Sequence, residues 1–121
     1  LERIRAVLDL EALGAEVLVL SADATDPIAM RSAVEQARSR FGAIDGAMHA
    51  AGVAGGGLLR HRRAADAAAV IDPKVRGLQV LLDAFGARRP PLLVLHSSLF
   101  AVVGGAGQAD YSGANAALDL H

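Results

Sequence analysis

Apolar residues recur along this chain at two different spacings. Within residues 1–13 they recur every three or four positions, and Gly14 follows the last of them. This period is typical of one face of a helix that is ended by a glycine. The predicted apolar face consists of Leu1, Ile4, Val7, Leu8 and Ala12.

Three short segments are instead apolar almost without interruption. They are residues 16–21 (EVLVLS), 44–50 (IDGAMHA) and 92–97 (LLVLHS). Continuous apolar runs of this length are typical of strands that are buried on both faces of a parallel sheet. We therefore predict a strand in each of the three places.

Helix signals lie between these runs. Asp26 and Pro27 suit the N-cap and the first position of a helix that runs to about Phe41. A longer helix is predicted over residues 64–85, with Pro73 either kinking or dividing it. The last helix begins near Gln108, and the glycines of residues 52–57 predict a flexible loop.

The alternation of helices and strands predicts an α/β fold. Its form would be a doubly wound parallel sheet with right-handed crossovers and helices on both faces. Three strands are few for such a sheet. We therefore interpret residues 1–121 as a single partial domain, an interior segment of a larger fold that lacks the first βαβ unit.

Composition narrows the class of protein. The chain is 53% hydrophobic, and its formal net charge of −1 gives no reason to expect a nucleic-acid partner. It has no cysteine, which excludes disulfides and thiolate metal sites, and we predict no metal. No apolar run approaches the ~20 residues that cross a bilayer, and no secretory signal is visible. These features predict a soluble, cytoplasmic protein with no membrane contact.

Candidate binding residues follow the predicted strands, where the ligands of open α/β sheets gather. These positions are Ser21–Asp23, His49–Gly52 and Ser97–Ser98. Small residues there would let a flat cofactor lie close to the backbone. Asp23 suits a hydrogen bond from an adenine amino group, although on spacing alone a turn or capping role is the commoner one.

Candidate catalytic residues gather around the last predicted helix. Tyr111 and Asn115 are four residues apart and so share a helix face. Ser98 ends the strand before this helix. The glycine-rich loop between Ser98 and Tyr111 could fold the serine hydroxyl over the tyrosine phenol. A phenol becomes a useful acid when an ammonium lies nearby, and Lys74 is the only lysine. Taken singly, Lys74 and Asn115 also fit a solvated helix charge and a helix-surface amide.

Three stretches together resemble a known family. HAAGV (49–53), PKVRG (73–77) and SSLFAVVGGAGQADYSGANAALD (97–119) resemble the ketoreductase domain of modular (type I) polyketide synthases. That domain belongs to the short-chain dehydrogenase/reductase superfamily, which has a Rossmann-like fold. Most of the superfamily carries a lysine four residues after the tyrosine. These ketoreductases carry asparagine there and take the lysine from the preceding long helix, as Asn115 and Lys74 do here.

The resemblance implies a reaction and roles for individual residues. The reaction is the NADPH-dependent reduction of a β-ketoacyl thioester on an acyl carrier protein to a β-hydroxyacyl thioester, in polyketide biosynthesis. Tyr111 would donate a proton to the carbonyl oxygen, to which Ser98 would also hydrogen-bond. Lys74 would favour ionisation of the tyrosine and relay the proton, and Asn115 would order the site and its water. The implied cofactor-binding residues are Asp23 at the adenine, Ala50, Ala51 and Gly52 beside the nicotinamide ribose, and Lys74 and Tyr111.

Other family features are absent from the sequence. Neither the Gly-rich turn that cradles the pyrophosphate nor the strand that supplies arginine to the 2′-phosphate has a counterpart. We therefore expect the 121-residue chain by itself to be inactive. The stereochemistry stays open, because Ala54-Gly55-Gly56 replaces the Leu-Asp-Asp marker of one alcohol configuration and Val103 replaces the tryptophan marker of the other.

Two other interpretations remain at this point. One is a structural remnant that packs against neighbouring synthase domains without turnover, and the other is a stand-alone short-chain reductase. The complete set of four catalytic residues favours an enzyme, and Asn115 argues against the stand-alone class. The basic run Arg60–Arg63 suits an acidic carrier protein, but a solvated loop is the simpler prediction. His96 is predicted to be buried in its strand.

Overall fold

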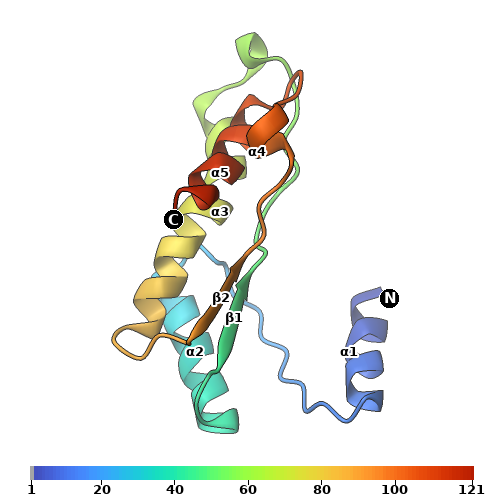
Figure 1. Cartoon of the computed structure of the whole chain (residues 1–121), viewed down its shortest axis with the longest axis vertical. Helices are drawn as coiled ribbons and strands as arrows, with labels where there is room; N and C mark the ends of the chain where they lie inside the picture. Colours follow the sequence, from blue (N-terminus) through green and yellow to red (C-terminus); the bar gives the residue numbers. More distant parts are fainter. Residues whose placement is uncertain (1) are drawn as a thin grey trace.

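Two short parallel strands form the sheet (Figure 1). The computed structural model describes residues 2–121, so Leu1 of the predicted apolar face lies outside the described residues. Strand β1 (Gly46–His49) pairs with β2 (Leu92–Leu95), with His49 opposite Leu95. Each strand lies inside a segment that was predicted to form one, and each is shorter than predicted.

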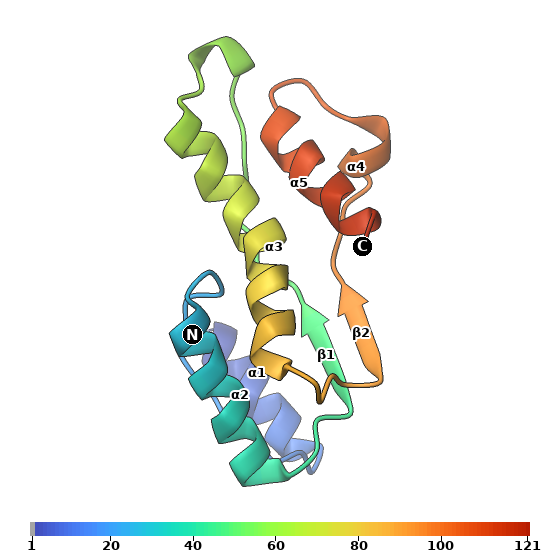
Figure 2. The same cartoon turned by 90° about the vertical axis from the view of Figure 1, so that its left-hand side faces the viewer.

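The longer helices cover the sheet unequally, with α2, α3 and α5 on one side and α1 on the other (Figure 1, Figure 2). Helix α2 spans Pro27–Phe41, α3 spans Ala64–Phe85 and α5 spans Ala109–Asp119. On the other side, α1 (Glu2–Ala12) stands apart from the sheet and has no buried residue. The predicted α/β architecture with a parallel sheet is confirmed. No helix within residues 2–121 is long and apolar enough to span a bilayer.

Capping residues set the ends of the predicted helices. The side chain of Asp26 accepts hydrogen bonds from the backbone N–H groups of residues 28 and 29, at 2.8 and 3.2 Å. Gly42 ends α2 with a φ of 83°, a conformation that side chains disfavour. Pro73 lies inside α3 without dividing it. A 3₁₀ turn (Leu59–His61) and the short helix α4 (Phe100–Val103) were not predicted.

The strand predicted over residues 16–21 is wrong. Residues 15–23 form no strand, and the side chains of Leu18 and Val19 are 40% and 69% exposed. A strand needs a hydrogen-bonded neighbour, because its backbone donors and acceptors point sideways. Strands β1 and β2 pair only with each other, so this apolar segment has no partner among the described residues.

The buried core joins α3 and α5 to the sheet. Leu78 and Leu82 of α3 and Leu118 of α5 are buried together, with Leu93 and Leu95 of β2 packed against them. Burying such side chains is the main favourable contribution to packing. The same packing holds the two helices that carry Lys74 and Tyr111 next to each other.

Candidate active site

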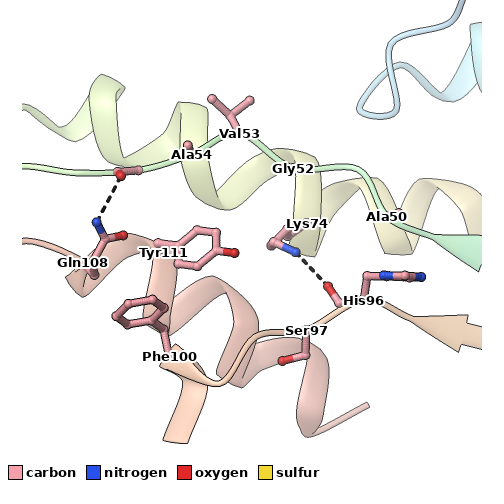
Figure 3. Close-up of a pocket in the computed structure, with 11 residues that line it drawn as sticks. Ala50, Gly52, Val53, Ala54, Lys74, His96, Ser97, Phe100, Gln108 and Tyr111 are labelled. Atoms are coloured by element: carbon pink, nitrogen blue, oxygen red, sulfur yellow. Dashed lines mark hydrogen bonds between the residues drawn. The ribbon is translucent and has the colours of Figure 1, made fainter. Parts of the chain in front are cut away.

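A cavity of about 440 Å³ opens beyond the carboxyl ends of the two strands (Figure 3). One wall is the glycine loop, defined here as residues 52–57, and the opposite wall is the start of α5. The chain after β2 and the middle of α3 close the remaining sides. The lining residues are Ala50, Gly52, Val53, Ala54, Gly55, Lys74, His96, Ser97, Phe100, Gln108 and Tyr111.

Lys74 projects from α3 into this cavity. It is 5% exposed, and its Nζ donates a hydrogen bond to the carbonyl oxygen of His96 at 2.8 Å (Figure 3). None of the ion pairs within residues 2–121 involves Lys74. A buried charge without a counter-ion is costly and is therefore characteristic of functional sites.

Tyr111 lies on the first turn of α5, across the cavity from Lys74. Figure 3 shows its hydroxyl pointing toward the Lys74 side chain, whose Nζ is 6.0 Å from the centre of the tyrosine ring. The ring of Phe100 packs edge-on against Tyr111, with 6.2 Å between ring centres. The tyrosine ring therefore contacts an aromatic side chain and also lies near the Lys74 ammonium.

Asn115 is fully buried one turn after Tyr111. Its Nδ2 donates to the carbonyl oxygen of Tyr111 at 2.8 Å, while its Oδ1 is buried without a hydrogen-bond partner among the described residues. A buried amide oxygen without a partner is costly. Asn115 thus supports the turn that carries Tyr111 and leaves one acceptor available.

Ser98 lies just beyond the cavity lining. Its Oγ accepts a hydrogen bond from the backbone N–H of Phe100 at 3.3 Å. The preceding residue, Ser97, lines the cavity and donates to the carbonyl oxygen of Asn115 at 3.3 Å. Lys74 and Tyr111 therefore line the cavity, whereas Ser98 and Asn115 are not among its lining residues.

The predicted cofactor-binding residues occupy two places. Ala50 and Gly52 line the cavity, and Ala51 between them does not. Asp23 is exposed in the turn before α2, where its Oδ1 accepts hydrogen bonds from the backbone N–H and the hydroxyl of Thr25, both at 2.8 Å. These bonds hold the pKa of the Asp23 carboxyl below its usual 3.8.

His49 contributes in a way that the sequence did not indicate. It is 4% exposed, and its Nε2 donates to the carbonyl oxygen of Lys74 at 2.8 Å. Burial lowers the pKa of the imidazole and outweighs the hydrogen bond to the Lys74 carbonyl, which acts to raise it; the Lys74 ammonium lowers the pKa further. His49 therefore fixes the backbone of Lys74 through this hydrogen bond. His96, which was predicted to be buried, is exposed because β2 ends one residue before it.

Arg62 and Asp110 form an ion pair that the sequence also did not indicate. Their side chains are 19% and 6% exposed, so the prediction of a solvated basic loop is wrong for Arg62. Burial alone would raise the pKa of Asp110, but hydrogen bonds from Arg62 and from the Tyr111 N–H outweigh it and lower the pKa. The partners are 48 residues apart, so no local spacing could have revealed them.

Known proteins resemble the chain along nearly its whole length. A family model described as the KR domain matches residues 2–120. The polyketide synthase PksL of Bacillus subtilis (strain 168) is 38% identical over 122 residues, a match that covers 98% of this chain and 3% of PksL. The chain thus spans a small part of this relative.

Solved structures agree with that match. A crystal structure of an N-terminal ketoreductase from the macrolactin assembly line superposes with a TM-score of 0.89 at 34% identity, over 98% of this chain and 24% of the other. A short chain dehydrogenase from Burkholderia cenocepacia J2315, in complex with NADP, superposes with a TM-score of 0.84 at 34% identity, over 97% of this chain and 49% of the other.

Proposed function

The chain belongs to the KR domain family, and on that premise we propose that it carries the catalytic residues of a ketoreductase. Its substrate would be a β-ketoacyl thioester on an acyl carrier protein, and its product the β-hydroxyacyl thioester of a polyketide pathway. Neighbouring synthase domains would be its other partners. The family places the chain among the oxidoreductases, whereas the tethered substrate and NADPH are parts of the proposal.

One observation carries this proposal. The buried ammonium of Lys74 and the hydroxyl of Tyr111 face each other in a cavity at the carboxyl ends of the strands (Figure 3). Asn115, rather than a lysine, stands one turn after the tyrosine. An acid next to a buried cation, open to a ligand on one side, suits proton transfer to a carbonyl oxygen.

The cavity suits one end of a nicotinamide cofactor. A Cβ atom on Gly52 would lie 3.1 Å from Cε of Lys74. Because Gly52 has no side chain, the wall of the cavity beside the lysine is flat. Ala50 and Gly52 would hold the nicotinamide end there. Both hydrogen bonds to Asp23 end on Oδ1, so its Oδ2 is left to accept one from an adenine amino group. The cofactor, when bound, supplies the hydride.

The protein groups would complete the reduction by moving one proton. Tyr111 donates the proton of its hydroxyl to the carbonyl oxygen of the substrate, which becomes the alcohol oxygen. The Oγ of Ser98 already accepts from Phe100 N–H, so its own proton is available for the same carbonyl oxygen. The ammonium of Lys74, anchored on the His96 carbonyl, stabilises the resulting phenolate until solvent returns a proton.

A Tyr111→Phe substitution tests the proposal in the protein that carries this chain. We expect the rate of reduction of a diffusible β-ketoacyl thioester to fall by about 10²–10⁴-fold, which is the usual contribution of a general acid. Binding of NADPH, followed by its fluorescence, should stay within about twofold, because the ring still fills its place against Phe100. A near-normal rate in this variant would refute the assignment.

A further inference from the structure

The Arg62–Asp110 ion pair joins two opposite walls of the cavity. Arg62 follows the glycine loop and precedes α3, whereas Asp110 lies on the first turn of α5, directly before Tyr111. Asp110 uses its second carboxylate oxygen, Oδ1, to accept the backbone N–H of Tyr111 at 2.9 Å. The carboxylate thus connects the guanidinium to the backbone of the proposed proton donor.

Arg62 also holds the glycine loop itself. Its Nη1 donates to the carbonyl oxygen of Gly56 at 3.1 Å, and its Nη2 donates to the carbonyl oxygen of Asp66 at 3.2 Å. The planar guanidinium can make several such bonds at fixed angles, which a lysine cannot. One side chain therefore ties together the glycine loop, the start of α3 and the start of α5.

A second set of contacts lies beside the ion pair. Nε2 of Gln108 donates to the carbonyl oxygen of Gly55 at 3.3 Å (Figure 3). A Cβ atom on Gly107 would lie 3.3 Å from the backbone nitrogen of Gly57, so the two backbones approach closely. These contacts fix a loop of small residues that has no helix or strand of its own.

We propose that the Arg62–Asp110 pair is a positioning device that sets the distance between the glycine loop and Tyr111. This proposal rests on the proposed function, because the effect of the ion pair is to place Tyr111, the proposed proton donor. Neither residue lines the cavity, so neither is a catalytic residue. Removing either partner leaves the other as an uncompensated charge in a poorly hydrated place, which strongly favours separation of the two walls.

A double-mutant cycle in the protein that carries this chain tests the proposal. The variants are Arg62→Met, Asp110→Asn and the double substitution, with Arg62→Lys as the conservative change. Arg60→Met is the matched control, since Arg60 is exposed in the same basic run and its side chain hydrogen-bonds, within residues 2–121, only to its neighbour His61. We expect each single variant to lower kcat for a diffusible β-ketoacyl thioester at least about tenfold, with NADPH affinity within about twofold.

The kcat of the double variant should be no lower than that of the less active single variant, because the pair acts as a unit. Arg62→Lys should recover part of kcat, and Arg60→Met should match the parent. Unchanged kcat in Arg62→Met, or additive losses in the double variant, would overturn the proposal.

Amide hydrogen exchange separates this proposal from the proposed function. Exchange should rise in both residues 52–63 and residues 107–112 when either partner is replaced, and not elsewhere. This readout does not need catalysis. If the parent protein reduces no ketone but the two segments loosen together, the proposed function fails and the positioning role stands. Exchange that rises in one segment alone, or throughout the domain, refutes the positioning role.

Discussion

Two glycines on helices should respond in opposite ways to the same substitution, Gly→Ala. Gly77 is buried on α3, where a Cβ atom would lie 3.3 Å from Cε1 of His49 and 3.4 Å from Cβ of Ala24. Gly113 is on α5, and a Cβ atom there would meet nothing within 4 Å. Neither glycine has a positive φ, so alanine can adopt both backbones.

The two contributions can be separated by size. Alanine is preferred over glycine inside a helix by about 0.5–1 kcal/mol. Gly113→Ala should therefore raise the free energy of unfolding by about that amount. Gly77→Ala gains the same helix-propensity contribution, but its Cβ also displaces His49 or Ala24. Overpacking of this kind costs about 1–3 kcal/mol. Its free energy of unfolding should consequently lie about 1–3 kcal/mol below that of Gly113→Ala.

Urea-induced unfolding of the domain that carries this chain, followed by circular dichroism, measures both values. The Gly77→Ala variant should also reduce ketones more slowly, because His49 holds the backbone carbonyl of Lys74 at 2.8 Å. If Gly77→Ala stabilises the domain as much as Gly113→Ala does, the close packing of α3 on His49 is refuted.

Three further outcomes follow from the same contacts. Gly52→Ala should lower kcat, since its Cβ would lie 3.1 Å from Cε of Lys74; an unchanged rate would contradict the placement of the lysine. Burial lowers the pKa of His49 below 6.5, so the folded state binds this proton less readily than the unfolded chain. The free energy of unfolding should fall as pH drops below about 6.5, and less so in His49→Gln; equal slopes would exclude this cause. For Asp110, burial acts to raise the pKa, yet the bonds from Arg62 and the Tyr111 N–H keep it below 3.8. The stability that this carboxylate contributes should be present above pH 3.8 and disappear as pH falls further, and Asp110→Asn should lack that loss in acid unfolding curves.

Signals that act within a few residues were sufficient to predict α1, α2, α3 and α5, but not the short helix α4. Asp26 caps α2 through the N–H groups two and three residues later, and Gly42 ends it through its own φ. The predicted bounds of α3, residues 64–85, match the structure at both ends, where Gly86 follows the helix with a φ of 59°. Both strands that pair were also found in apolar runs.

The sequence identified Lys74 and Tyr111 through the spacing of a family pattern, and the structure brings both to one cavity. The sequence did not show what holds them. His49 supports Lys74 from 25 residues away, and Arg62 supports the turn of Tyr111 from 48 residues away through Asp110. Separations of this size leave no periodicity for a reader to detect.

Tertiary structure also decided which apolar run became a strand. Residues 16–21 have the composition of a buried strand as clearly as residues 92–97 do, yet only the latter lie beside another strand. Helices satisfy their backbone hydrogen bonds internally, so local sequence is enough to determine them. Strands and ion pairs are satisfied by distant parts of the chain, so they exist only where the fold supplies the partner.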